Sequence, residues 1–260
     1  MAGMHSNEQA WRNGAERGTC QIVISNYNLN YQWSRAASVG HANRQARVKE
    51  RQDGASTRTN LLNAAGGVFA ELGFDRATAK EIASRAETNA AAVNYHFGGI
   101  QGLYEEVLVE AHRRIVNYND LAQALAASSD PKEKLRRLLS LVVKVIRADV
   151  KDAWPIKIIV RELIAPTAHI ERLRREELEP KKALLTGVVA EIMGIERDDA
   201  LVGQAVFSVM SPCFMMMVAE KRLSEIIPSI GREVTSDDEL VDRLVCFALG
   251  GLAGLAGDRA

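Results

Sequence analysis

The fold is decided by residues 61–99, LLNAAGGVFAELGFDRATAKEIASRAETNAAAVNYHFGG. Apolar residues recur through its first part at the spacing of one helix face, and Gly73 is placed to end that helix in a left-handed cap. The segment Thr78-Ala-Lys-Glu81 then has the form of a capping box. In such a box the Thr78 hydroxyl accepts from the Glu81 amide, and the Glu81 side chain returns to the Thr78 amide. A second, short helix is therefore expected to begin there.

A turn and a third helix follow at once. Glu87 and Thr88 form the turn, Asn89 is a good N-cap, and residues 90–97 are expected to be helical until two glycines break the helix. Two short helices joined by a short turn, behind a longer supporting helix, place the second of them in the major groove of DNA. The pattern predicts a helix-turn-helix, although a purely structural helical hairpin has the same outline.

The rest of the chain also has helical periodicity, and its helix starts are well marked. Asp130-Pro-Lys-Glu133 combines an N-cap, a proline at the first helical position and an acid at the third, and Ser236-Asp-Asp-Glu239 repeats the capping box. Helices are expected at about 131–148, 154–164, 169–193 with a bend at Pro180, 198–222 with a kink at Pro212, and 237–255. No strand is predicted, so the fold class is all-α.

Composition divides the chain into three parts. Residues 1–54 are rich in Asn, Gln, Ser, Gly and Arg, poor in Leu, and without helix or strand period, so we interpret them as a mostly disordered N-terminal extension. A three-helix helix-turn-helix DNA-binding domain is expected over residues 55–118. A helical ligand-binding and dimerisation domain is expected over residues 119–257.

Charge and cysteine content favour a cytoplasmic protein. The 33 Lys and Arg residues balance the 33 Asp and Glu residues, so any contact with DNA must be local. The three cysteines have neither zinc nor redox spacing, and the first part of the chain lacks the sustained apolar segment of a secretory signal. Residues 200–219 are uncharged and long enough to span a bilayer, but a helix buried in a core or subunit interface is the favoured interpretation, so no membrane partner is expected.

Residues 61–108 resemble the DNA-binding domain of TetR/AcrR-family regulators. The parts come in the family's order: Phe69 and Gly73 in the first helix, Thr78 opening the second, Ile82, Ala83 and Ala86 packing it, then Val93, Tyr95, His96 and Phe97, and Leu103 in the fourth. The NYHFGG variant and the RELIAPT stretch at 161–167 look like the CecR-type subgroup, which extends the resemblance to about residues 56–257.

The chain departs from the family pattern at two places. Glu87-Thr88-Asn89 stands where the family usually has Gly-Val-Ser, so the turn keeps its geometry only if residue 87 tolerates what glycine supplies. Ile100 stands where a phosphate-binding lysine is usual. Residues 57–117 also hold six basic against seven acidic side chains, so weak non-specific DNA affinity with a shallow salt dependence is expected.

The DNA contacts are predicted by side-chain chemistry. Asn94 and Tyr95 are assigned to base edges or thymine methyls, because an amide pairs with adenine and an aromatic ring packs on a methyl group. Thr78, Asn89 and His96 are expected to contact phosphates near the helix N-termini. The small Ala90 and Ala91 would let the helix sit deep in the groove, although they are equally suited to packing. The basic Lys80 and Arg58 would add positive charge. Arg58 belongs to a basic run that suits either a minor-groove arm or a solvated tail.

The resemblance implies that the last two long helices pair with their copies in a homodimer. The residues assigned to this interface are Val209, Cys213, Met216, Phe247, Gly250, Gly251 and Gly254. An effector pocket is assigned to adaptable apolar side chains and one cation: Trp154, Arg161, Phe207, Met210 and Phe214. A methionine and aromatic stripe at helical spacing is also what an ordinary core presents.

These features favour a ligand-responsive transcriptional regulator, a repressor in the first instance. It would bind a palindromic double-stranded operator as a homodimer and be released by a small-molecule effector. No catalytic motif or metal-ligand spacing is present in the sequence, so neither an enzyme nor a metal or cofactor is expected. A helical ligand-binding or adaptor protein that has lost DNA binding is the alternative, and activation rather than repression remains open because it depends on operator position.

Overall fold

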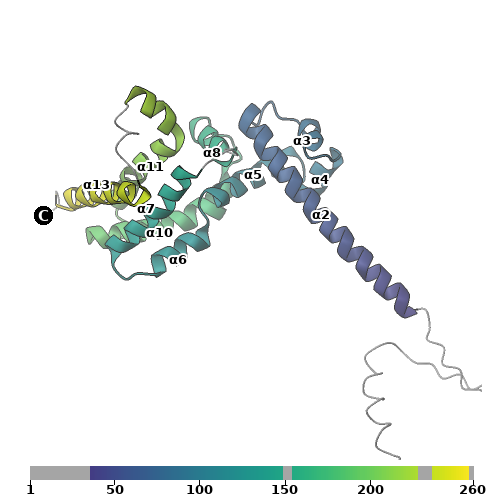
Figure 1. Cartoon of the computed structure of the whole chain (residues 1–260), viewed down its shortest axis with the longest axis horizontal. Helices are drawn as coiled ribbons and strands as arrows, with labels where there is room; N and C mark the ends of the chain where they lie inside the picture. The colour runs from purple at the N-terminus through teal and green to yellow at the C-terminus, as the bar shows by residue number, and fades with distance from the viewer. Residues whose placement is uncertain (1–35, 149–153, 228–235, 258–260) are drawn as a thin grey trace, which may run out of the picture. The chain divides into compact units, whose positions relative to one another are not determined.

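The computed structural model describes residues 36–148, 154–227 and 236–257, and within these ranges the chain is entirely helical. The expected all-α fold class is confirmed, with no strand in the described ranges (Figure 1). The elements are α2 (Ala36–Leu72), α3 (Ala79–Arg85), α4 (Ala91–Phe97), α5 (Ile100–Ile115), α6 (Tyr118–Ala126), α7 (Pro131–Arg147), α8 (Trp154–Ile164), α9 (Ile170–Leu173), the π-helix η1 (Arg174–Leu178), α10 (Glu179–Met193), α11 (Ala200–Ile226) and α13 (Asp237–Gly257).

Helix α2 begins well before the expected start of ordered structure. The prediction of a disordered extension is wrong for residues 36–54, which are helical, while residues 1–35 lie outside the described residues. This part of α2 is rich in Ala, Arg, Gln, Lys and Glu, whose helix propensity needs no apolar face. The chain divides into two units, up to Thr59 and from Asn60.

The predicted helix starts have the expected caps. Thr78 Oγ1 accepts from the Glu81 amide at 3.2 Å, Asp130 Oδ1 accepts from the Lys132 amide at 3.0 Å, and Ser236 Oγ accepts from the Glu239 amide at 3.2 Å. Each bond satisfies a backbone donor that the first helical turn leaves unpaired. These caps fix where α3, α7 and α13 begin.

Two hydrophobic cores organise the second unit. The first lies among α2, α3, α4 and α5 and is built on fully buried side chains such as Phe69, Val93 and Leu103. It also includes Ile158 of α8 and Leu173 of α9, which come from beyond the expected domain boundary at residue 118. Helix α8 therefore packs on α5 as part of the first core.

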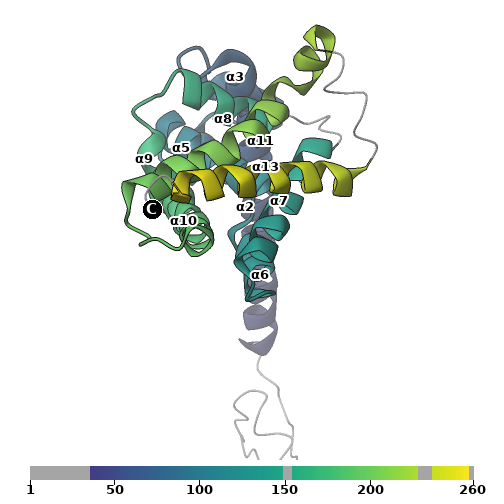
Figure 2. The ribbon, with the colours of Figure 1, turned by 90° about the vertical axis from the view of Figure 1, so that its left-hand side faces the viewer.

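The second core joins α6, α7, α10, α11 and α13. Leu135, Leu139 and Val143 line the inner face of α7 and are buried against α13, which crosses it (Figure 2). Val202 and Ala205 contribute the inner face of α11. This arrangement leaves the opposite faces of α11 and α13 outside the core.

The expected single helix over 169–193 is interrupted. The segment Arg174–Leu178 forms a π-helical turn between α9 and α10, directly before Pro180. Proline cannot donate to the helix ladder, and its ring collides with the carbonyl four residues earlier. A widened turn accommodates both effects, so the expected bend takes the form of a π-bulge.

Candidate nucleic-acid interface

Helix α4 has one buried side and one exposed side. Val93 is fully buried in the first core, and Phe97 packs against the same core at the end of the helix. On the opposite side Ala91, Asn94 and Tyr95 are exposed, and the Tyr95 ring is 84% exposed. A large aromatic side chain with that exposure makes no contribution to the core, so it is available to a partner.

The two predicted phosphate-contacting polar residues stand at the starts of α3 and α4. Thr78 is exposed and caps α3. The N-cap position of α4 is Ala90 rather than Asn89, which corrects the expected cap by one residue. Asn89 still acts as a cap, because its Oδ1 accepts from the Ala92 amide at 3.0 Å.

The turn between α3 and α4 holds the backbone of one residue in a strained conformation. Glu87 has φ = 53° and is the one non-glycine residue with positive φ in the described ranges. The turn is nevertheless closed, because the Thr88 amide donates to the Ala83 carbonyl at 2.9 Å. Residue 87 thus adopts the left-handed conformation that glycine reaches without a Cβ penalty.

The start of α5 depends on a glycine that the motif comparison did not single out. A Cβ at Gly102 would collide with the Phe97 carbonyl oxygen at the end of α4. Gly102 therefore lets α5 approach the last turn of α4 closely. The signal in the sequence was a glycine inside a helix first turn, where it has no intrinsic advantage.

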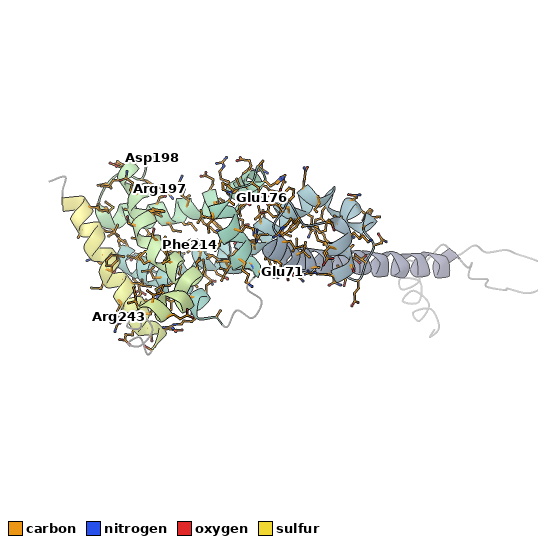
Figure 3. The ribbon with its side chains drawn as sticks, turned by 90° about the horizontal axis from the view of Figure 1, so that it is seen from above. Glu71, Glu176, Arg197, Asp198, Phe214 and Arg243 are labelled. Atoms are coloured by element: carbon orange, nitrogen blue, oxygen red, sulfur yellow. The ribbon has the colours of Figure 1, made fainter. Side chains whose placement is uncertain are left out.

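The surface around α3 and α4 has little unbalanced positive charge. Arg85 donates to Glu81 at 2.9 Å and to Glu71 at 2.8 Å, and Figure 3 labels Glu71 on α2. Arg114 likewise pairs with Glu110 at 2.8 Å. Lys80 of α3 is exposed and makes no ion pair within the described residues, so its charge is available to a partner.

The other two predicted DNA-contacting side chains are less exposed. His96 is half-buried, with its ring edge-on to Tyr95 at a centroid distance of 4.8 Å. Arg58 is half-buried and lies before Thr59, in the first unit. The exposed members of the predicted set lie on α3, on α4 and at their N-terminal caps, and they are called here the reading face: Thr78, Lys80, Asn89, Ala90, Ala91, Asn94 and Tyr95.

A buried polar network behind the reading face was not predicted. The Tyr104 hydroxyl of α5 donates to Glu162 Oε2 of α8 at 2.7 Å, and Glu162 is 1% exposed. The Thr167 amide and hydroxyl donate to Glu162 Oε1 at 2.7 and 2.9 Å. Burial raises the pKa of Tyr104, and the hydrogen bond to Glu162 adds to this, so the phenol stays protonated. The network joins α5, the helix after α4, to α8.

A second buried cluster joins α5 to η1 and α10. Lys181 Nζ lies 2.6 Å from Glu177 Oε2 and 2.8 Å from His112 Nδ1, and Arg113 Nε donates to Glu177 Oε1 at 2.6 Å. Burial lowers the pKa of His112 to about 4, assisted by the Lys181 charge. His112 is therefore neutral at neutral pH and accepts from the ammonium group.

The residues assigned to an effector pocket differ in their surroundings within the described part of the chain. Trp154 packs against α2, where a Cβ at Gly66 would lie 2.5 Å from its ring, and Phe207 is 74% exposed. Met210 and Phe214 are half-buried on α11, where Figure 3 labels Phe214. Arg161 alone of the five lines an open cleft of about 510 Å³ beside α8.

The residues assigned to the dimer interface divide into two groups. Val209 and Cys213 are buried in the second core, and Met216 packs against it, so these three stabilise the protomer. Phe247 is 70% exposed, and a Cβ at Gly250, Gly251 or Gly254 would meet nothing within 4 Å. The sequence did not identify Met215 of α11, which is 52% exposed.

Helices α11 and α13 also have the length and apolar composition of membrane-crossing helices. The segments concerned are Ala200–Val218 and Asp237–Gly257. Length and composition are the whole of that resemblance, since core helices of soluble proteins have the same two properties.

A short helix pair with one exposed face, mounted on a helical C-terminal bundle, defines a helix-turn-helix transcriptional regulator. The family model for bacterial regulatory proteins of the tetR family matches residues 61–107. The family model for the C-terminal domain of the HTH-type transcriptional dual regulator CecR matches residues 131–252. The chain belongs to the TetR family of transcriptional regulators.

Individual relatives agree with this assignment. The chain is 28% identical to the dual regulator CecR of Shigella flexneri, over 56% of this chain and 69% of that protein. It is 24% identical to the transcriptional repressor NicS of Pseudomonas putida, over 66% of this chain and 80% of that protein. FadR of Bacillus subtilis, solved in complex with stearoyl-CoA, shares the fold with a TM-score of 0.56 at 15% identity, over 74% of this chain and 98% of that one. These relatives are regulators rather than enzymes.

Proposed function

We propose that the protein is a cytoplasmic repressor that binds a palindromic operator as a homodimer and is released by a small-molecule effector. The observation that supports DNA reading most directly is the asymmetry of α4, with Val93 fully buried and Tyr95 84% exposed. Buried packing holds the helix at a fixed angle, while Asn94 and Tyr95 extend outward to base edges. One relative bears the name of a repressor and another that of a dual regulator, so the direction of control is part of the proposal.

The homodimer is supported by what the protomer leaves uncovered. Phe247 and the three glycines of α13, together with Phe207 and Met215 of α11, present an apolar surface outside the second core. Exposed glycines permit close approach of a second helix, and large apolar side chains on a surface mark an interface. Two-fold pairing of this surface would place two reading faces on half-sites about one helical turn, roughly 34 Å, apart.

Effector release requires that a ligand favour a protomer arrangement unsuited to DNA. Helix α8 links the two cores, because it packs on α5 within the first core, where Glu162 accepts from the Tyr104 hydroxyl, and also contacts α11 of the second core. A ligand that favours the DNA-incompetent arrangement by about 3 kcal/mol would weaken operator binding roughly a hundredfold.

A helical ligand-binding or adaptor protein is the competing function. The ion pairs of Arg85 and the absence of a lysine at position 100 favour it, because both reduce attraction to phosphates. Such a protein would keep the effector site and the dimer while binding DNA weakly or not at all.

Selection from random double-stranded DNA tests the proposal against this competitor. The full-length protein is expected to enrich a two-fold-symmetric motif, and its affinity for that motif should fall only gently with salt, since few phosphates are neutralised. Enrichment of no motif would contradict operator binding and leave the adaptor function.

A further inference from the structure

Helix α8 borders the open cleft of about 510 Å³ with apolar and cationic side chains together. Ile156, Val160 and Ile164 of α8 and Val218 of α11 provide the apolar walls, and Lys157 and Arg161 provide the charge. A volume of this size suits a small molecule, since ligand sites commonly measure about 300–1,000 Å³. The cleft is thus large enough and apolar enough to take an elongated hydrocarbon body.

The two cations of the cleft have no acidic counterpart among its described lining residues. Lys157 and Arg161 are four residues apart on α8, which places them on the same side of the helix. The lining residues include no Asp or Glu, and neither cation forms an ion pair within the described part of the chain. Two positive charges that no described acidic residue balances, beside an apolar wall, favour an anion attached to an apolar body.

Arg161 also connects this cleft to the first core, which contains the end of α2. A Cβ at Gly73, which ends α2, would lie 2.7 Å from Arg161 Nη1, so the guanidinium lies across the end of α2. The opposite side of α8 bears Ile158, which is fully buried, and Glu162, which holds the Tyr104 hydroxyl. A ligand group that binds Arg161 therefore acts on α8, a helix that contacts both α2 and α5.

We propose that this cleft binds a free amphipathic anion, in which a carboxylate or phosphate headgroup pairs with Lys157 and Arg161 and an apolar chain lies along Ile156, Val160 and Val218. The proposal rests on the effector role proposed above and gives that effector a chemical class. The Tyr104–Glu162 bond is the positioning contact through which movement of α8 reaches α5, and Gly102 at the start of α5 touches the end of α4.

Calorimetric titration of the full-length protein without DNA tests the binding. The probes are decanoate and decyl phosphate below their micelle concentrations, with decanol as the uncharged match and butyrate as the short-chain match. Saturable binding of at least one long-chain anion is expected, at least about tenfold tighter than decanol and butyrate. Comparison of decanoate with decyl phosphate shows which headgroup the cations prefer.

Variants locate the site. Lys157→Gln and Arg161→Gln are each expected to weaken binding of the long-chain anion about tenfold or more. Lys144→Gln on the exposed side of α7 and Arg175→Gln on η1 are the matched controls and should bind as wild type, with urea unfolding confirming that all four variants fold.

Three results would overturn the proposal: no saturable binding of either long-chain anion, equal binding of decanol, or unchanged affinity in both cleft variants. Because DNA is absent from the titration, failure of the anion site is distinguished from failure of operator binding. Release of selected DNA by the bound probe is measured separately.

Discussion

The reading face on α4 and the effector pocket predicted in part on α11 were both inferred from side-chain type. The two helices differ in how clearly their sequences indicate which side is buried. On α4, one buried valine and an exposed tyrosine settle which side of a seven-residue helix faces outward. On α11, the uncharged stretch 200–219 gives no such polarity in the sequence, and Phe207 is exposed although nearby Val209 is buried in the core. A short amphipathic helix with marked ends reveals its orientation in sequence, whereas a uniformly apolar helix does not.

The sharpest way to test the uncovered apolar surface is Phe247→Asp on α13. A charge in a two-fold interface is buried twice, so we expect the dimer Kd to rise at least about a hundredfold. Sedimentation equilibrium over a concentration series measures it, with Tyr118→Asp on α6 as the exposed-aromatic control. A variant that remains dimeric at the wild-type concentration would place the interface elsewhere.

Acid should destabilise the protein through the cluster behind α5. The pKa of His112 is about 4 when folded and about 6.5 when unfolded, so the unfolded state binds more protons between these values and stability falls as pH drops through them. We expect His112 to cost on the order of 2 kcal/mol between pH 7 and pH 5.

His112→Gln removes this titration while keeping an acceptor for Lys181. Urea unfolding of wild type and variant at both pH values measures the difference. Burial alone would raise the pKa of Glu177, but the hydrogen bonds from Lys181 and Arg113 outweigh it and lower the pKa. This group acts in the same direction at lower pH, because the stabilisation of the carboxylate is lost on protonation. An equal pH response in the two proteins would show that His112 is not the group responsible.

Removing the hydroxyl from Tyr104 tests the link between α5 and α8. Tyr104→Phe leaves Glu162 Oε2 buried without that donor, and we expect a loss of about 1.5 kcal/mol in the free energy of unfolding. Tyr118→Phe, at an exposed position, should cost nothing measurable. A Tyr104→Phe protein as stable as wild type would mean that the network contributes nothing to the packing of α8 on α5.

The strained turn offers a smaller gain. Glu87→Gly should stabilise the protein by about 0.5–1 kcal/mol, because glycine adopts the left-handed conformation without the Cβ penalty and recovers more than it loses in chain entropy. Glu87→Ala removes the charge but keeps the strain, so no such gain is expected. Equal unfolding midpoints for the two variants would show that charge, not φ, determines the effect.

The part of the molecule open to sequence analysis was the part with local signals. Capping residues Thr78, Asp130 and Ser236 mark helix starts because their hydrogen bonds reach only two or three residues along the chain. The Tyr104–Glu162 pair is 58 residues apart, and no local pattern indicates it.

Burial within α11 and α13 was also beyond the sequence. Val209 and Phe247 have similar chemistry, yet one is buried and the other exposed, because the choice depends on which helices pack against each face. The helical start at Ala36 has a different explanation, because a segment with helix propensity but no amphipathic pattern has the same sequence signature as a disordered one.

If the reading face contacts base edges, its exposed side chains determine the affinity of the protein for selected DNA. Fluorescence anisotropy compares wild type, Tyr95→Ala, Asn94→Ala and the control Tyr118→Ala on the same enriched duplex, after urea unfolding has confirmed equal stability. Loss of about tenfold or more in affinity for the first two variants, with the control unchanged, is the predicted result. Wild-type affinity in both α4 variants would contradict DNA reading by this face.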